Sequence, residues 1–129
     1  MKAILNFLVL PCLLITPIAV DLMQTGGPHG GVLKKSNNYY IEMKTVDNFF
    51  YTYLLDGKQK VISSKNLSCN VRFFLADSTD LILQLKPFDN GFKGENIQGY
   101  RYCKITFNVD EKTTESALFE NQKPVVNKE

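Results

Sequence analysis

Short apolar runs separated by turn residues fill the chain between residues 32 and 119. In the runs at 69–75 and 103–109, apolar side chains occupy every second position. A period of two residues matches a β-strand, in which successive side chains point to opposite faces, and no window keeps the 3.6-residue period of a helix. The sequence therefore predicts strands, at residues 32–35, 39–46, 49–55, 59–63, 67–76, 81–86, 100–109 and 113–119.

The turn residues between these runs predict how the strands assemble. The pairs Asn37-Asn38, Asp47-Asn48 and Asp56-Gly57 each separate two apolar runs, and such pairs favour tight hairpin turns. About seven or eight short strands with turns every 8–12 residues are typical of an all-β, antiparallel β-sandwich with an immunoglobulin-like arrangement. A small β-barrel is the alternative, because it produces the same alternation.

The aromatic residues of the third predicted strand indicate which of its faces is buried. Tyr51 and Tyr53 share one face, and we expect that face to belong to the core. Phe50, Phe74 and Phe92 are then left to cover a second face or to form an exposed patch where a partner docks.

The N-terminal residues 1–20 predict a secretory signal peptide. Lys2 precedes an apolar run at 3–20, which is the layout of such a segment. An uncleaved membrane anchor is the alternative, because the run just reaches the ~17–25 residues that span a bilayer. We expect export to a bacterial periplasm and no stable membrane span after processing. A glycine-rich lead-in at 21–31, a β-sandwich domain at 32–119 and a flexible tail at 120–129 would follow.

Size and composition exclude several classes of function. With 129 residues the chain is long enough for one domain, and a formal charge of +2 gives no basic patch for nucleic acid. His29 is the only histidine, which excludes two-histidine catalytic schemes. No phosphate-binding loop, dinucleotide fingerprint or nucleophile motif is present. We therefore expect a protein that is not an enzyme.

Two cysteines, Cys69 and Cys103, fall on the predicted core faces of their strands. In an exported protein they are candidates for a disulfide across the sandwich. The alternative is two buried thiols that never meet, because the sequence gives no Cα separation.

The segment Pro28-His29-Gly30-Gly31 contains the most distinctive candidate for a binding site. Its glycines let the backbone approach a neighbour closely, and imidazole is the commonest side-chain ligand for borderline metals. Glu42 and Asp56 are the nearest acidic residues that strands would position. The alternative interpretation is a surface histidine beside a turn.

Three short motifs give the sequence a family resemblance. Pro28-His29-Gly30-Gly31 is followed by Tyr39-Tyr40-Ile41-Glu42 and then by Tyr53-Leu54-Leu55-Asp56. This order resembles small exported proteins of Bacteroidetes-like bacteria that share a P-H-G-G motif, a Y-H-[IL]-E motif and a strand ending in Y-L-x-D. Such proteins accompany heavy-metal efflux systems, and the resemblance covers most of residues 27–109.

The resemblance implies a metal site as well as a cellular context. Carried over by position, its metal-facing groups are His29 and Glu42, and its metal is a divalent transition ion such as Cu or Zn. The second histidine of the family corresponds to Tyr40 here, and a phenol is a weak ligand at neutral pH. The implied partners are periplasmic components of a metal efflux complex.

Two functions are therefore expected. The first is a non-enzymatic periplasmic accessory of metal efflux or homeostasis that binds metal through His29 and Glu42. The second is a metal-free binding or scaffolding module that contacts another envelope protein through exposed aromatic residues or a free sheet edge.

Overall fold

The computed structural model describes residues 26–121 of the chain. The predicted signal peptide, and all but the start of the predicted tail, lie outside these residues. The described part forms nine strands and one short 3-10 helix: β1 (Val32–Ser36), β2 (Tyr39–Val46), β3 (Phe49–Leu55), η4 (Ser64–Asn66), β4 (Ser68–Leu75), β5 (Asp80–Gln84), β6 (Lys86–Phe88), β7 (Gly91–Glu95), β8 (Tyr100–Asn108) and β9 (Thr114–Glu120).

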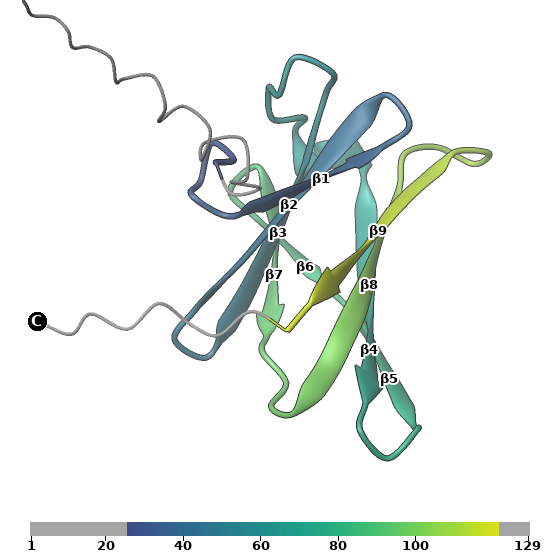
Figure 1. Ribbon diagram of the computed structural model, residues 1–129. Coiled ribbons are helices and arrows are strands. Elements are labelled where there is room, and N and C mark those ends of the chain that lie inside the picture. The colour runs from purple at the N-terminus through teal and green to yellow at the C-terminus, as the bar shows by residue number, and fades with distance from the viewer. Residues whose placement is uncertain (1–25, 122–129) are drawn as a thin grey trace, which may run out of the picture.

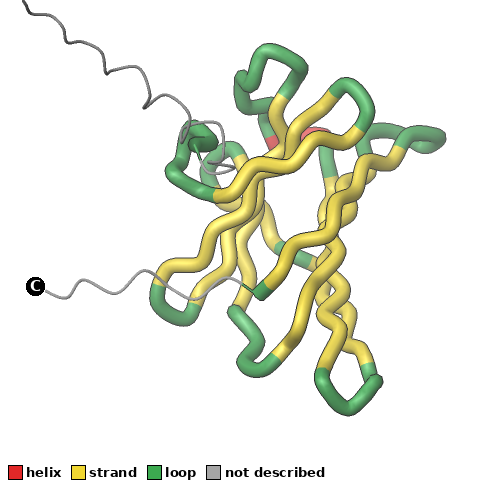
Figure 2. The backbone as a smooth tube through the Cα atoms, viewed as in Figure 1, coloured by secondary structure: helices red, strands yellow, loops and turns green. Residues whose placement is uncertain are grey.

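The strands form two antiparallel sheets that face each other (Figure 1). One sheet has five strands in the order β1-β2-β3-β7-β6, and the other has four in the order β5-β4-β8-β9. Almost all of the described chain outside these strands is loop or turn (Figure 2). The predicted all-β sandwich is confirmed, and the two sheets do not close into a barrel.

The first hairpins follow the turn residues closely. The β1–β2 and β2–β3 turns pair Ser36 with Tyr39 and Val46 with Phe49, so each turn has two central residues. Asn37 and Asp47, which begin these turns, have positive φ angles of 54° and 56°. Asn and Asp tolerate this conformation better than most residues, which is why the turn positions were predictable.

The part of the chain that follows β3 departs from the predicted strand list in three places. The predicted strand at 81–86 is two strands, because the chain crosses from one sheet to the other at Leu85, whose side chain is buried. Residues 91–95, expected in a loop, form β7. Residues 59–63 are not a strand, and only Val61 forms an isolated bridge, to Leu55. Residues 26–121 therefore contain nine strands rather than the predicted seven or eight.

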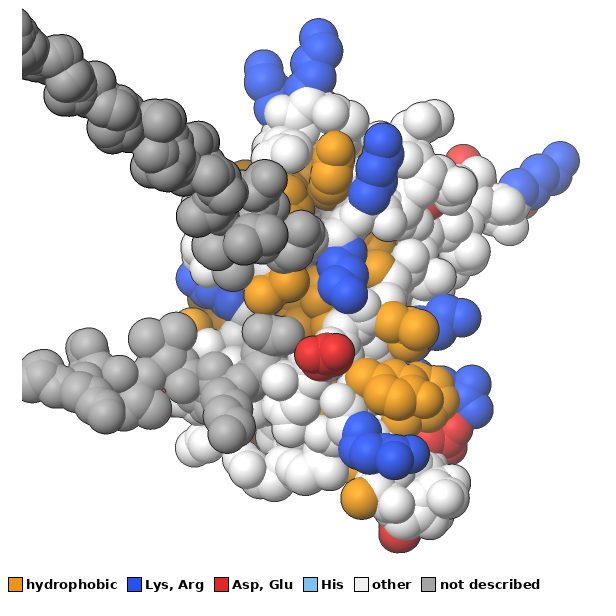
Figure 3. Space-filling view, in the orientation of Figure 1, with side chains coloured by type: hydrophobic (Ala, Val, Ile, Leu, Met, Phe, Trp, Pro, Cys, Tyr) orange, Lys and Arg blue, Asp and Glu red, His pale blue; other side chains and the backbone are white. Residues whose placement is uncertain are grey.

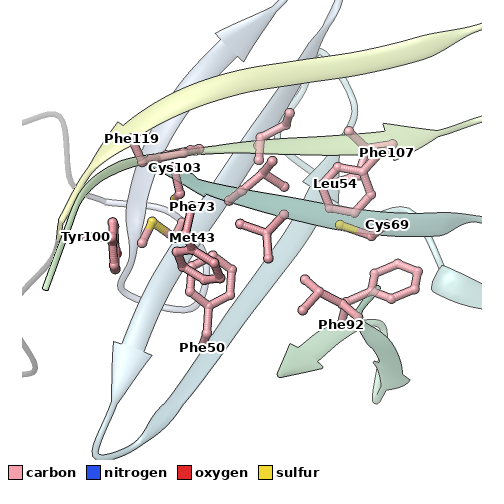
Figure 4. Packing of buried hydrophobic residues seen from close by; sticks show 14 residues of the cluster. Met43, Phe50, Leu54, Cys69, Phe73, Phe92, Tyr100, Cys103, Phe107 and Phe119 are labelled. Atoms are coloured by element: carbon pink, nitrogen blue, oxygen red, sulfur yellow. The ribbon is translucent and has the colours of Figure 1, made fainter. Parts of the chain in front are cut away.

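The core lies between the two sheets, and Figure 4 shows its aromatic centre. The predicted inward residues of β4 and β8 are buried, as their alternation indicated, except that Leu75 at the end of β4 is half-buried. Phe rings meet edge to face across the core at centroid distances of 5.7 Å, in the pairs Phe50–Phe73 and Phe92–Phe107. The buried cluster comprises Ile41, Met43, Phe50, Leu54, Cys69, Val71, Phe73, Leu85, Phe92, Tyr100, Cys103, Ile105, Phe107 and Phe119.

The prediction for the aromatic face of β3 is wrong. Phe50 and Phe92 are buried in the core, whereas Tyr51 and Tyr53 lie on the opposite, outward face of the five-stranded sheet. Because β3 is apolar on both faces, alternation alone does not decide its orientation, and the contact of Phe50 with Phe73 does.

Of the two alternatives left open for Cys69 and Cys103, the structure has the second, since both cysteines are free and buried. They lie on β4 and β8 of the same sheet, and the residue opposite Cys103 is Phe73, four positions along β4 from Cys69. At a rise of ~3.3 Å per residue, this offset exceeds the ~7 Å Cα separation that a disulfide tolerates. Burial raises the pKa of Cys103 to about 12 and also raises that of Cys69, so both thiols stay protonated.

A buried polar contact joins the two sheets where β1 lies beside β9. Glu115, on β9, accepts hydrogen bonds from Ser36 Oγ (2.6 Å) and Asn37 Nδ2 (2.9 Å), at the end of β1. The backbone N–H of Ser116 donates to Ser36 Oγ at 3.2 Å. We call this group, Ser36, Asn37, Glu115 and Ser116, the β1–β9 seam.

Residues 26–121 contain no helix of the length and hydropathy that a membrane crossing requires.

Candidate functional site

Glu42 is a fully buried acidic residue in the middle of β2. It is paired with Leu33 of β1 on one side and Tyr53 of β3 on the other. Its side chain is on the face of the five-stranded sheet that points away from the core, the same face as Tyr53. The carboxylate is buried because residues 26–31 fold back over it.

The fold-back depends on glycine. The N–H of Gly30 donates to the carbonyl of Gly27 at 2.8 Å, and Gly30 has a φ of +80°, which other residues rarely adopt. A Cβ atom on Gly27 would lie only 2.4 Å from Oε2 of Glu42. A side chain at Gly27 would therefore collide with the carboxylate, and one at Gly30 would strain the turn that covers it.

The closed turn supplies three hydrogen-bond donors to Glu42. The backbone N–H groups of His29 and Gly31 both donate to Oε2 at 2.8 Å, and Nδ1 of the His29 ring lies 2.7 Å from Oε1. A carboxylate is an acceptor only, so Nδ1 carries the proton. The remaining ring nitrogen, Nε2, is then the one with a free lone pair.

Two further contacts hold His29 in place, one at its ring and one at its backbone. The Tyr53 ring stacks on it with a centroid distance of 3.5 Å and an interplanar angle of 7°. Lys44 Nζ donates to the carbonyl of His29 at 3.0 Å. The His29 side chain nevertheless stays 29% exposed, so the ring is held in place and still reachable from solvent.

The imidazole opens onto a shallow pocket of about 400 Å³. Asp89, in the β6–β7 turn, contributes an acidic side chain to the same pocket. Burial raises the pKa of the Tyr53 phenol, and the charges of Glu42 and Asp89 raise it further. The lining residues are His29, Lys44, Val46, Tyr51, Tyr53, Phe88 and Asp89.

The structure brings together two of the residues singled out in the sequence and separates the others. His29 and Glu42 are in direct contact. Asp56 instead accepts hydrogen bonds from the N–H groups of Lys58 and Lys60 in its own turn, and the bond from Lys60 is the main cause of its lowered pKa. Tyr40 does not line the pocket, and its ring lies 5.9 Å from Nζ of Lys35.

The sequence did not identify Tyr53, Lys44 and Asp89 as neighbours of His29. Tyr53 was assigned to the core, and its position under the imidazole becomes clear only when β3 is oriented. Lys44 follows Glu42 by two residues, so the alternation of β2 places both on one face and offered a signal. Asp89 comes from a distant turn, and nothing in its local sequence connects it with His29.

The described residues offer few metal ligands at this place. Within 26–121, no three side chains of His, Cys, Asp or Glu converge in a way that would hold a metal ion. Both oxygens of Glu42 are already occupied by hydrogen bonds. The site therefore consists of the oriented imidazole of His29, whose Nε2 faces no hydrogen-bond partner within 26–121, and of Asp89 on the wall of the same pocket.

No family model matches the chain, and no similar protein was found among curated proteins or solved structures.

Proposed function

We propose that this protein is a non-enzymatic, periplasmic accessory of heavy-metal efflux or homeostasis that binds Cu or Zn through Nε2 of His29. One observation carries the proposal: the buried carboxylate of Glu42 holds the Nδ1 side of the imidazole at 2.7 Å. Histidines that bind metals almost always donate their other ring N–H to such an acceptor, which fixes the tautomer and makes the ligand more basic.

In this proposal Glu42 is the positioning residue and His29 is the ligand. The two oxygens of Glu42 accept three hydrogen bonds and are covered by the 26–31 turn, which leaves no lone pair directed at the pocket. The resemblance implied that both residues face the metal. The geometry supports a division of roles between them.

Asp89 is the second ligand in the proposed site, because its carboxylate lines the pocket with His29. Zinc and copper sites with four coordination positions would then keep two for water or for groups of another protein. Such an open site suits the transfer of a metal between carriers better than its permanent storage. It also gives a reason for partners in an efflux complex.

Glu42→Gln tests the proposal without removing the side chain. The amide oxygen of Gln still accepts the two backbone N–H groups, and the NH₂ group faces Nδ1 and donates to it. Nδ1 must then be the acceptor, so the ring proton moves to Nε2 and the metal ligand is lost. We expect a loss of about 10–100-fold in Cu(II) or Zn(II) affinity by calorimetric titration.

Glu115→Gln is the matched control, because Glu115 is also a buried glutamate that accepts hydrogen bonds but lies at the β1–β9 seam. It should leave metal affinity unchanged. His29→Ala should abolish binding, and acidification should weaken it in the native protein because protons compete for Nε2. Native protein that binds neither metal, or equal binding in His29→Ala, would refute the proposal.

A metal-free binding module is the second candidate, and the exposed rings beside the pocket favour it. Phe49 and Phe88 are both exposed, and Nζ of Lys93 lies 4.1 Å and 4.8 Å from their ring centroids. Large exposed apolar side chains next to a cation are common in contact surfaces. This function predicts a partner in the envelope whose capture is lost in Phe88→Ala and is unaffected by metal chelators.

A further inference from the structure

β5 is the one strand edge in the described part of the chain that nothing protects. Its backbone pairs with β4 on one side only. Figure 1 shows it at the outer border of the molecule, away from the other sheet. Its side chains are largely exposed, with Ile82 at 59% and Leu81 at 38%.

The other three edges of the two described sheets carry features that prevent strand addition. β1 and β9 lie against each other at the β1–β9 seam, and β1 also carries Lys34 and Lys35. β6 has only three residues, one of which is Pro87. Lysine, proline and covering contacts are the usual means by which proteins block edges, whereas the middle of β5, Leu81-Ile82-Leu83, has none of them.

We propose that β5 is a pairing edge, and that its partner is β5 of a second copy of this chain. The sequence of the strand is self-complementary about Ile82. In an antiparallel pair centred there, Ile82 lies opposite Ile82 of the second copy, and Leu81 lies opposite Leu83. Directly opposed apolar pairs of this kind stabilise a sheet.

The charges at the ends of the strand also fit a second copy. In the same register Asp80 lies opposite Gln84 of the second copy, so no like charges meet. Asp80 is already neutralised within its own chain, because Nε of Arg72 donates to its Oδ2 at 2.7 Å. A two-fold axis at Ile82 is therefore free of electrostatic repulsion.

Pairing would cover apolar surface on both faces of the four-stranded sheet. Ile82 projects from the outward face, beside Arg72, while Leu81 projects toward the core at a border that no strand covers. Figure 3 shows hydrophobic side chains exposed among charged ones in the region of β4 and β5. The paired β5 strands would join two four-stranded sheets into one continuous sheet and bury these side chains.

Cysteine cross-linking tests the register directly. The third cysteine of the sequence, Cys12, is first replaced by serine. Ile82→Cys in this background places two thiols opposite each other across the axis, where Cα separations of ~4.5–5.5 Å allow a disulfide. The native Cys69 and Cys103 are buried and do not compete. Under mild oxidation we expect most of the Ile82→Cys protein to form a covalent dimer on a non-reducing gel.

Leu118→Cys is the matched control, because Leu118 is 51% exposed on β9 and far from the proposed axis. It should cross-link at least tenfold more slowly. Analytical ultracentrifugation tests the same two positions with lysine substitutions. The native protein and Leu118→Lys should dimerise as the concentration rises. Ile82→Lys should remain monomeric, with an unchanged circular dichroism spectrum.

Several outcomes would overturn the proposal. A native protein that is monomeric at every concentration and cross-links no faster at residue 82 than at 118 has no such pairing. A dimer that survives Ile82→Lys uses another surface. An edge that stays monomeric but binds an added extended peptide would have a partner other than a second copy. None of these results depends on metal binding at His29.

Discussion

Glu42 and Glu115 are both buried glutamates that accept hydrogen bonds, yet they hold different parts of the molecule. Glu115 accepts hydrogen bonds from Ser36 and Asn37, and so joins the two sheets. Ser36 and Glu115 are 79 residues apart in the chain. Glu42 accepts from His29 and Gly31, which belong to a turn at the start of the described chain. The carboxylate of Glu115 therefore connects the two sheets, whereas that of Glu42 binds a short N-terminal turn to the outer face of one sheet.

The donors show why only one of the two is a candidate for function. Glu115 contacts a hydroxyl group and an amide, and neither of these changes its protonation at physiological pH. Glu42 contacts an imidazole that is partly exposed at a pocket. A buried carboxylate therefore indicates a site only when it orients a group that reacts with ligands or protons.

The comparison predicts that Glu115→Ala has the largest effect on stability. Removing the carboxylate leaves the donors of Ser36 and Asn37 without their acceptor at a place where the sheets must stay together. We expect a loss of about 2 kcal/mol in the free energy of unfolding, measured by urea denaturation. An effect smaller than that of Glu42→Ala would show that the β1–β9 seam does not join the sheets energetically.

Glu42→Ala should cost less, about 1 kcal/mol, although Glu42 is more deeply buried and accepts more hydrogen bonds. The 26–31 turn can detach and expose its N–H groups to water, which limits the loss. Hydrogen exchange should show fast exchange for the amides of His29 and Gly31, with the strands still protected. Loss of protection throughout β2 and β3 would contradict this local role.

The smallest predicted effect is the coupling between His29 and Glu42. A double-mutant cycle of His29→Ala with Glu42→Gln should give about 0.5–1 kcal/mol, because the imidazole and carboxylate share one partly exposed hydrogen bond. The parallel cycle of His29→Ala with Glu115→Gln should give no coupling. Equal coupling in both cycles would mean that the turn and the seam respond as one unit.

The sequence predicted those parts of the fold that are encoded locally. Two-residue turns at Asn37 and Asp47 and the strict alternation of β4 and β8 sufficed to identify strands and their buried faces. The orientation of β3 was missed, because Phe50 and Tyr51 are both apolar enough to be buried. A contact with another sheet decides between them.

The same distinction applies to the candidate site. Short motifs connected His29 with Glu42 in the sequence. The glycines of the first motif indicated a close backbone approach, and Gly27, just before that motif, does lie against the carboxylate of Glu42. The stacking of Tyr53 and the position of Asp89 depend on strand orientation and on a distant turn. Those features depend on tertiary contacts, which cannot be predicted from the local sequence pattern.

The β1–β9 seam has a consequence for the order in which the molecule folds. The β1–β2 and β2–β3 hairpins close through two-residue turns and need only microseconds, whereas the contact between Ser36 and Glu115 must close a loop of 79 residues. We therefore expect the hairpins to form early and the seam to form late. Weakening the seam should accordingly speed unfolding and leave the folding rate nearly unchanged.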